Sequence, residues 1–404
     1  MEKNLREKHS KALVLIHNFP RFPTDISGIG FQPLFTKLAA HVDLDFLVPH
    51  DRGLKEEDIF NNLRVHRFRY GREDNEVLAY RGNMHLRALK KPLTTWRFLQ
   101  AFRCKAIQLA GRLAPDVLWA HWWIPAGWVG YKARFTYPIP LVITCHGTDI
   151  FLLNRFRWLR PLARRVFSTA DRITVVSHFL KRQLIDAIGV QGNELEDKII
   201  IAPLPVKREA FYYDPDIERA PNTIISASRF TKQKHVDLLL RAVARLTNEG
   251  ISCQLDLYGD GPERQTLNNL IRQLSLQQQV HLHSPLTQVD LAERYRRSAI
   301  AVLASEHEGF GLMLVEAMLC GCVAVGARSG GITDIISEDG TDGLLIEPGS
   351  VDSLYRALKM LLTDEQLRRR LAAAGCESAA KRFSDQQIIS QFRQLISPKG
   401  KIIY

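Results

Sequence analysis

The sequence is poor in the features that mark disulfide-bonded, secreted and membrane-spanning proteins. Its 404 residues include six cysteines, and no two of them form a CxxC pair. Most of the cysteines stand in apolar segments, so we expect reduced core residues in a cytoplasmic protein. No apolar run reaches the length of a membrane span. The charged start, residues 1–11, and the short apolar run 12–16 do not resemble a secretory signal.

Acidic residues are outnumbered by basic ones, 43 to 55, which leaves a net charge of +12. This balance favours a polyanionic partner such as nucleic acid, an anionic membrane or a phosphorylated substrate. Zinc-finger spacing and basic–aromatic nucleic-acid signatures are missing, so we expect no nucleic-acid partner. No cluster of histidine and acidic residues has metal-ligand spacing. Asp43-Leu44-Asp45 has the DxD form of metal-dependent transferases, but its place at a strand start favours coincidence, and we expect no metal.

One stretch, residues 299–334, organises the rest of the chain. Ala299–Ala304 is apolar throughout, which is typical of a strand buried on both faces of a parallel sheet. A polar, glycine-rich loop follows at 305–311, and then an almost wholly apolar helix is predicted over 312–320. A second buried strand is predicted over 322–326. The pattern therefore predicts a strand–loop–helix–strand unit.

Glu316 is the exception in that apolar helix, since a buried carboxylate is costly unless hydrogen-bond donors meet it. Glu308 stands eight residues earlier, beside Gly309 and Gly311. Glycines let backbone N–H groups approach a ligand closely, where the start of a helix favours negative charge. Two carboxylates flanking an anion cradle suit a sugar nucleotide. The alternative is that Glu316 pairs with a buried cation and the glycines only form a turn.

The stretch from Glu308 to Glu316 resembles the signature of the retaining GT-B glycosyltransferases of family 4. The resemblance implies that Glu316 holds the ribose hydroxyls of a UDP- or GDP-sugar and that Glu308 faces the donor sugar. It also implies that one short backbone segment lies along the sugar and phosphates: Gly309, Phe310, Gly311 and Leu312.

A basic pair follows a predicted strand at 223–228. Arg229 and Lys234 match the basic pair of the family, and the resemblance implies that they clamp the donor diphosphate and neutralise the departing nucleotide. His235 stands where the family usually has glycine. Gly259, in the turn after the next strand, is also expected at the donor.

The first half of the chain carries a His146-Gly147-Thr148-Asp149 sequence at the end of a predicted strand, 141–145. It resembles the HGxD motif of the family, which implies that His146 lies near the reacting carbon of the donor and that Asp149 has a capping or an acceptor role. Trp122 follows another strand and is either part of an acceptor platform or a core residue. Gly28, in Ser27-Gly28-Ile29-Gly30, marks either a phosphate or acceptor loop or a close helix–sheet contact.

Alternating strands and helices predict an α/β protein with two doubly wound Rossmann-like domains that face a cleft, the GT-B fold. We expect an acceptor-binding domain over 1–205, a nucleotide-sugar-binding domain over 206–385, and a final helix within 386–404 that the resemblance returns to the first domain.

The predicted function is retaining transfer of a sugar to a glycan, lipid-linked or small-molecule acceptor in polysaccharide biosynthesis, without a cofactor. His146, Glu308, Arg229 and Lys234 are the expected catalytic residues. Two alternatives stay open: a sugar-nucleotide 2-epimerase of the same fold, and a non-catalytic sugar-binding protein on a transferase scaffold.

Two stretches of the first half combine basic and apolar residues. A helical pattern over 86–113 is broken by Pro92, and arginines alternate with aromatic residues over 149–170. Such a composition is found in interfacial helices, and it is also found where a solvated face backs a core face. Peripheral contact with the inner face of an anionic membrane is therefore one hypothesis. The alternatives are a solvated surface, or cations that steer a soluble phosphorylated acceptor into the cleft.

Overall fold

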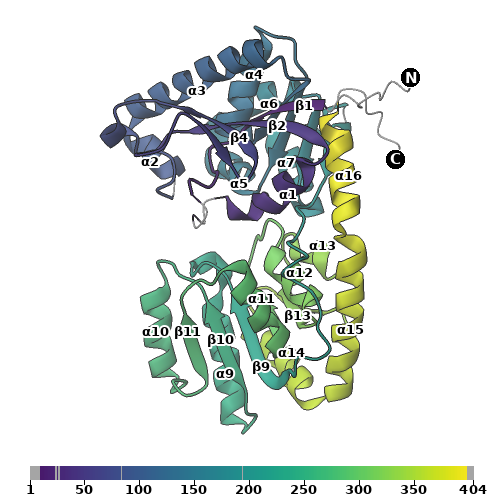
Figure 1. Cartoon of the computed structure of the whole chain (residues 1–404). Coiled ribbons are helices and arrows are strands. Elements are labelled where there is room, and N and C mark those ends of the chain that lie inside the picture. Colours follow the sequence, from purple (N-terminus) through teal and green to yellow (C-terminus); the bar gives the residue numbers. More distant parts are fainter. Residues whose placement is uncertain (1–9, 23–24, 26–27, 83, 193, 398–404) are drawn as a thin grey trace, which may run out of the picture. The chain divides into compact units, whose positions relative to one another are not determined.

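The computed structural model describes residues 10–22, 25, 28–82, 84–192 and 194–397 (Figure 1). The chain divides into two compact units, which we call the first unit (Met1–Leu204 with Gln386–Tyr404) and the second unit (Pro205–Asp385). Each unit has its own sheet. No helix in these described ranges combines the length and the apolar character needed to cross a bilayer.

The sheet of the first unit has eight strands in the described residues, in the order β3-β4-β2-β1-β5-β6-β7-β8. All neighbouring strands are parallel except β3 and β4. Sequence reasoning missed β3 because its Glu57, Asp58 and Ile59 are exposed and form no apolar run. The strands are β1 (Ser10–Leu15), β2 (Val42–Pro49), β3 (Glu57–Phe60), β4 (Leu63–Phe68), β5 (Val117–His121), β6 (Leu141–Cys145), β7 (Arg172–Val175) and β8 (Ile199–Ile201).

Helices cover this first sheet on both sides (Figure 1). The longest, α3, packs across β1, β2 and β4, while α4 packs on β5 and β6. The last helix, α16, belongs to this unit, since Phe392 lies against Trp119 and the carbonyl oxygens of Gln394 and Leu395 accept hydrogen bonds from Arg172. The α-helices are α1 (Gln32–Leu38), α2 (Met84–Lys90), α3 (Pro92–Leu113), α4 (Trp128–Arg134), α5 (Thr148–Arg155), α6 (Arg160–Ser168), α7 (His178–Ile188), α8 (Glu194–Asp197) and α16 (Asp385–Ile396). Short helical turns are η1 (Ile29–Phe31), η2 (Glu73–Asn75), η3 (Trp123–Gly127) and η4 (Arg157–Leu159).

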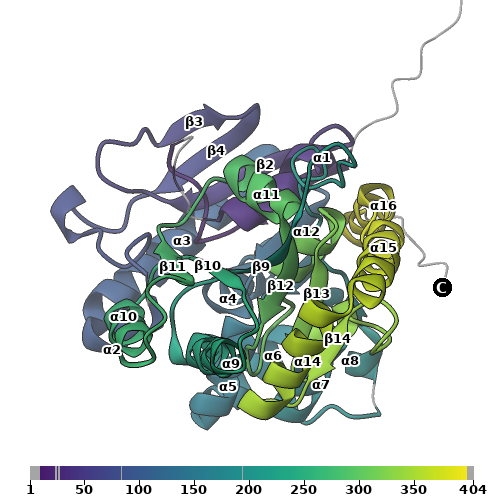
Figure 2. The same cartoon turned by 90° about the horizontal axis from the view of Figure 1, so that it is seen from below.

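The sheet of the second unit has six parallel strands in the described residues, in the order β11-β10-β9-β12-β13-β14. Figure 2 shows this order from left to right, with α11 and α12 on one side of the sheet and α9 and α14 on the other. The strands are β9 (Ala220–Ala227), β10 (Gln254–Tyr258), β11 (Val280–His283), β12 (Ser298–Leu303), β13 (Val323–Ala327) and β14 (Leu344–Ile346). The helices are η5 (Lys232–Lys234), α9 (Val236–Asn248), α10 (Arg264–Gln273), α11 (Gln288–Arg297), α12 (Leu312–Leu319), α13 (Ile332–Ile335), α14 (Val351–Thr363) and α15 (Glu365–Arg382).

Among the parallel strands, each sheet reverses its strand order at one position, between β1 and β5 in the first unit and between β9 and β12 in the second. Ligands of open α/β sheets bind beyond the carboxyl ends of the strands at such a switch point. The loops after β9 and β12 and the residues after β1 and β5 are therefore the places where the fold itself predicts binding.

The cysteines are free thiols, but not all of them belong to the core. Cys145, Cys253, Cys320 and Cys322 are buried, as expected from their apolar surroundings. Cys104 is exposed, which corrects that expectation for α3: the helix buries one face, and Cys104 lies on the other.

Candidate functional site

The loops after β9 and β12 are joined to each other at the switch point of the second unit. The backbone N–H of Glu306 donates to the carbonyl of Gln233 at 3.1 Å. The side-chain amide of Gln233 in turn donates to the carbonyl of His307 at 3.2 Å. We call residues 228–235, after β9, the basic loop and residues 304–311, after β12, the acidic loop. The two hydrogen bonds hold these loops side by side, although they are more than 70 residues apart in the sequence.

This junction brings Lys234 to Glu308, and the lysine ammonium donates to a carboxylate oxygen of Glu308 in an ion pair. Both side chains are mostly buried, with exposed fractions of 19% and 16%. Arg229 precedes the same loop and is exposed, and its guanidinium has no hydrogen bond or ion pair within the described residues. An unpaired guanidinium and a lysine on one segment are suited to a doubly charged group such as a diphosphate.

The loop after β13, residues 328–331, packs against the acidic loop. The N–H of Gly331 donates to the carbonyl of Glu308 at 2.8 Å. A Cβ on Gly331 would lie 2.5 Å from the carbonyl oxygen of Gly309, so only glycine fits there. The Phe310 ring points away from this loop and packs edge-on against Phe383 at 5.6 Å. The site therefore offers the backbone of Phe310, not its ring.

Gly311 ends the acidic loop and precedes α12 with a φ of +105°, a conformation that favours glycine. From Met313 to Leu319 every residue of α12 is buried except Glu316, which is partly exposed. The carboxylate of Glu316 has no hydrogen bond or ion pair among the described residues, so the alternative of a buried cation partner finds no support. Burial raises the pKa of Glu316 to about 8.

Gly259 and His235 complete the candidate site of the second unit. Gly259 follows β10, and a Cβ there would collide with the carbonyl oxygen of Ser228, so the residue is held by close packing. His235 adopts a left-handed conformation with φ +46° and ψ 41°, which glycine adopts without strain. The imidazole of His235 lies 3.6 Å from the carboxylate of Glu306.

The switch point of the first unit is filled by aromatic rings. His146, after β6, and His121, at the end of β5, are stacked with centroids 5.2 Å apart and planes at 12°. Trp122 lies against His146 on one side and His17 on the other, and Phe31 also contacts the His146 ring. Burial lowers the pKa of His146 to about 3 and that of His17 to about 4, so both imidazoles are neutral at physiological pH.

Asp149 is buried and serves the backbone. One oxygen accepts the N–H groups of His146 and Gly147, both at 3.1 Å, and the other accepts the N–H of Trp123 at 3.1 Å. The carboxylate thus fixes the turn that carries His146, which favours the capping role over direct acceptor contact. Trp123 is fully buried and belongs to the core, whereas Trp122 keeps an exposed fraction of 8%.

Gly28 takes a φ of +67°, and a Cβ there would lie 2.5 Å from the carbonyl oxygen of Asn18. This close backbone contact accounts for the glycine without a ligand. Ser27, next to it, lies outside the described residues. Asp45 of the DxD sequence accepts hydrogen bonds from Arg64 and His66, and no cluster of metal-ligating side chains is found in the part of the chain that the structure describes.

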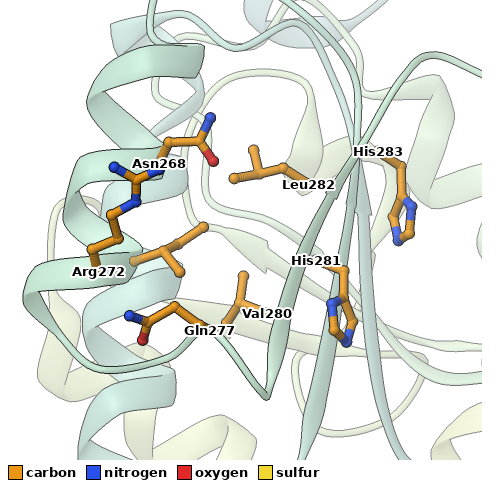
Figure 3. A pocket seen from close by; sticks show the side chains of 8 residues that line it. Asn268, Arg272, Gln277, Val280, His281, Leu282 and His283 are labelled. Atoms are coloured by element: carbon orange, nitrogen blue, oxygen red, sulfur yellow. The ribbon is translucent and has the colours of Figure 1, made fainter.

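A surface hollow of about 410 Å³ lies apart from these loops, between α10 and the edge strand β11 (Figure 3). Asn268 and Arg272 project toward it from α10, while His281 and His283 lie along the strand. His283 is already hydrogen-bonded to Asp256 at 2.6 Å and stacked on Tyr258. None of the predicted site residues lines this hollow.

The structure thus gathers the predicted donor residues at one switch point and His146, Asp149 and Trp122 at the other. Sequence reasoning missed His121 and His17, which meet His146 only because their three strands are sheet neighbours or near neighbours. Their position directly after apolar runs was the available signal. It also missed Gln233 and Gly331, whose roles are contacts between loops.

Comparison with known proteins agrees with this architecture. The model of Glycosyltransferase Family 4 matches residues 34–209, and that of Glycosyl transferases group 1 matches residues 209–377. N-acetyl-alpha-D-glucosaminyl L-malate synthase of Bacillus anthracis is 31% identical over 73% of this chain and 78% of its own length.

Solved structures show the same fold over nearly the whole length. Sucrose-phosphate synthase from Thermosynechococcus elongatus has a TM-score of 0.79 and 21% identity, and covers 96% of this chain and 98% of its own. Anabaena HepE, solved with UDP and glucose, has a TM-score of 0.72 and 20% identity, and covers 96% of this chain and 100% of its own. The chain therefore belongs to glycosyltransferase family 4, the glycosyl transferases group 1, whose GT-B enzymes transfer sugars from nucleotide-sugar donors.

Proposed function

We propose that the second unit binds a UDP- or GDP-sugar at the switch point between β9 and β12, and that the sugar is transferred with retention to an acceptor hydroxyl. The observation that carries this proposal is the ion pair of Lys234 with Glu308, beside the glycine-rich segment before α12 and on the same segment after β9 that carries Arg229, which is unpaired among the described residues. A solved structure of similar fold, Anabaena HepE, holds UDP and glucose, which supports a uridine donor.

Each group of the donor has a matching group in the second unit. The ribose hydroxyls are donors, and the carboxylate of Glu316, which has no partner among the described residues, can accept them. The diphosphate needs cations, which Arg229 and Lys234 supply. The sugar then lies toward Glu308, along the N–H groups of the 309–312 backbone.

The reaction breaks the bond between C1 of the sugar and the diphosphate oxygen, and negative charge develops on the departing nucleotide. Arg229 and Lys234 stabilise this charge, which lowers the barrier. The acceptor hydroxyl attacks C1 on the face that the nucleotide leaves, and its proton passes to the departing phosphate oxygen. The acceptor is bound by the first unit, where His146 contributes a neutral imidazole and Trp122 an aromatic surface.

The direct test is product analysis with UDP- and GDP-sugars in the presence and absence of candidate acceptors. We expect nucleoside diphosphate release that depends on an acceptor, and a product whose anomeric configuration, read by NMR, is that of the donor. An inverted product contradicts retention. Conversion of the donor without any acceptor indicates the 2-epimerase alternative, and the absence of any conversion indicates a binding protein.

A further inference from the structure

The first unit carries an apolar surface that the fold leaves uncovered. Helix α2 has no fully buried residue, although it contains Leu86 and Leu89. The next helix, α3, begins with Leu93 and Trp96 equally uncovered, with exposed fractions of 61% and 59%. Leu86 with Leu89, and Leu93 with Trp96, are three residues apart and therefore share a helix face. A cluster of large exposed apolar side chains is unusual on a soluble surface and marks an interaction site.

Basic side chains border these apolar residues. Lys90, Lys91 and Arg97 are exposed, and none of them has an ion pair within the described residues. The sequence contains no aspartate or glutamate from residue 77 to residue 115. No acidic residue of this segment therefore neutralises the positive charge of this surface.

A second segment acts on α2 electrostatically. Burial lowers the pKa of His85 in α2, and the positive charge of Arg155, the last residue of α5, lowers it further. The residues that follow, Arg157 and Trp158, are exposed, and Trp158 has an exposed fraction of 69%. The segment from 150 to 170 also contains no acidic residue. We call α2, the first turn of α3 and residues 155–158 the α2 surface; α2 and the start of α3 are visible at one end of the first unit in Figure 1.

The structure separates this surface from other arginines of the 149–170 stretch. Arg160 donates to the carbonyl of Leu153, and Arg164 donates to the carbonyl of Ile188. These two arginines close the ends of α5 and α7. The single interfacial helix considered from sequence is therefore replaced by two short helices, with only their junction on the α2 surface.

We propose that the α2 surface docks on the surface of an anionic lipid bilayer. Tryptophan and leucine at the level of the headgroups bury apolar area, and each basic residue near an anionic leaflet adds attraction. A second copy of the chain is a poorer occupant, because it would bring the uncompensated cations of two surfaces together. The docking itself does not depend on catalysis. Its consequence for the substrate, a lipid-linked acceptor, rests on the proposed transfer function.

The experiment is flotation of the full chain with two kinds of vesicle, phosphatidylcholine alone and phosphatidylcholine with an equal part of phosphatidylglycerol. We expect binding to the anionic vesicles only, weakened as salt is raised. Leu93→Ser with Trp96→Ser, and separately Lys90→Glu with Lys91→Glu, should each lower the bound fraction by about tenfold or more. These side chains are exposed, so the variants keep the core of the first unit intact.

Matched controls separate docking from changes in net charge or surface apolarity. Arg241→Glu with Lys381→Glu changes the net charge equally, at exposed positions of the second unit. Phe135→Ser removes an exposed aromatic side chain near the other end of α3, where Tyr137 packs on Gly111. Both controls should float like the parent protein.

Three outcomes overturn the proposal: no flotation with anionic vesicles, controls that lose binding as much as the α2 variants, or an α2 variant that changes only the oligomeric state in sedimentation. The last outcome assigns the surface to a second copy of the chain. Nucleotide binding, measured on the same variants, is expected to be unchanged, so failure of the membrane proposal is distinguishable from failure of the proposed function.

Discussion

Nδ1 of His121 lies 3.0 Å from Nε2 of His146, and burial lowers the pKa of both rings, so one neutral imidazole donates to the other. Nε2 of His121 is buried and has no partner among the described residues. An unpaired buried acceptor is tolerated more readily than an unpaired N–H. We therefore assign the shared proton to Nδ1 of His121, which leaves the N–H of His146 on Nδ1, free to donate to a ligand.

This assignment makes His121 a positioning residue for His146. His121→Leu should lower kcat by about 10- to 100-fold, a range taken from partners that orient metal-ligating histidines. His121→Asn keeps a donor near the place of Nδ1 and should recover part of that loss. Nucleotide affinity should not change in either variant, because His121 lies in the first unit. Equal kcat for both variants would contradict the assignment.

The backbone of the acidic loop lies so close to Gly330 that this position requires glycine. A Cβ on Gly330 would collide with the backbone of Glu308, whereas a Cβ on Gly340 meets no atom within 4 Å, and both glycines have positive φ. Gly330→Ala should therefore cost about 2 kcal/mol or more in stability and weaken nucleotide binding, while Gly340→Ala should cost about 1 kcal/mol and leave binding unchanged. Denaturant titration and calorimetry measure the two effects. Similar behaviour of the two variants would show that the loop adapts.

Lys234 should act on the departing nucleotide, whereas its neighbour Lys232 should not. Lys234→Gln is expected to lower kcat/KM by about 100- to 1,000-fold, because a charge opposite the developing anion is removed. Lys232 is exposed in the same turn, and Lys232→Gln serves as the matched control with activity near that of the parent protein. Equal losses in steady-state assays would indicate a general effect of charge on that turn.

Transfer should not require a divalent metal. Arg229 and Lys234 supply the positive charge that a metal would bring to the diphosphate, so turnover should persist in EDTA. Activity that disappears on chelation and returns with magnesium or manganese would refute this prediction and revive Asp43 and Asp45 as candidate ligands.

Much of the fold follows from apolar runs in the sequence. The strand predicted over 141–145 has the bounds of β6 in the structure, because an apolar run with polar ends marks it. The sequence also places Glu316 on an apolar helix, since a single carboxylate among seven apolar neighbours is visible without coordinates. The antiparallel edge strand β3 was beyond this reasoning, because three of its four residues are exposed and they form no apolar run.

The candidate site was predictable only where its residues are close in sequence. Glu308 and Glu316 belong to one loop–helix unit, so their relation is local. The pairing of Lys234 with Glu308, and that of His121 with His146, depends on which strands become neighbours in each sheet. The left-handed conformation of His235 could not be read from its residue type, since histidine adopts it rarely.

The account depends most on Glu316. Burial raises the pKa of its carboxyl group to about 8, so this group is mostly protonated at pH 7 in the unliganded protein. Ribose hydroxyls donate to the ionised carboxylate, and binding should therefore lower its pKa and release a proton. Affinity should consequently rise with pH between about 6 and 8, by at most about tenfold per unit. Glu316→Gln has no proton to release and should show less of this dependence.

Isothermal titration calorimetry of UDP, GDP and ADP at pH 7, in buffers that differ in ionisation enthalpy, tests this directly. For at least one of these nucleotides, we expect the parent protein to release up to one proton more than Glu316→Gln, and the variant to bind about 1–3 kcal/mol more weakly. Equal affinities and equal proton release would contradict the account, because Glu316 would then be a structural residue and not a ligand of the nucleotide.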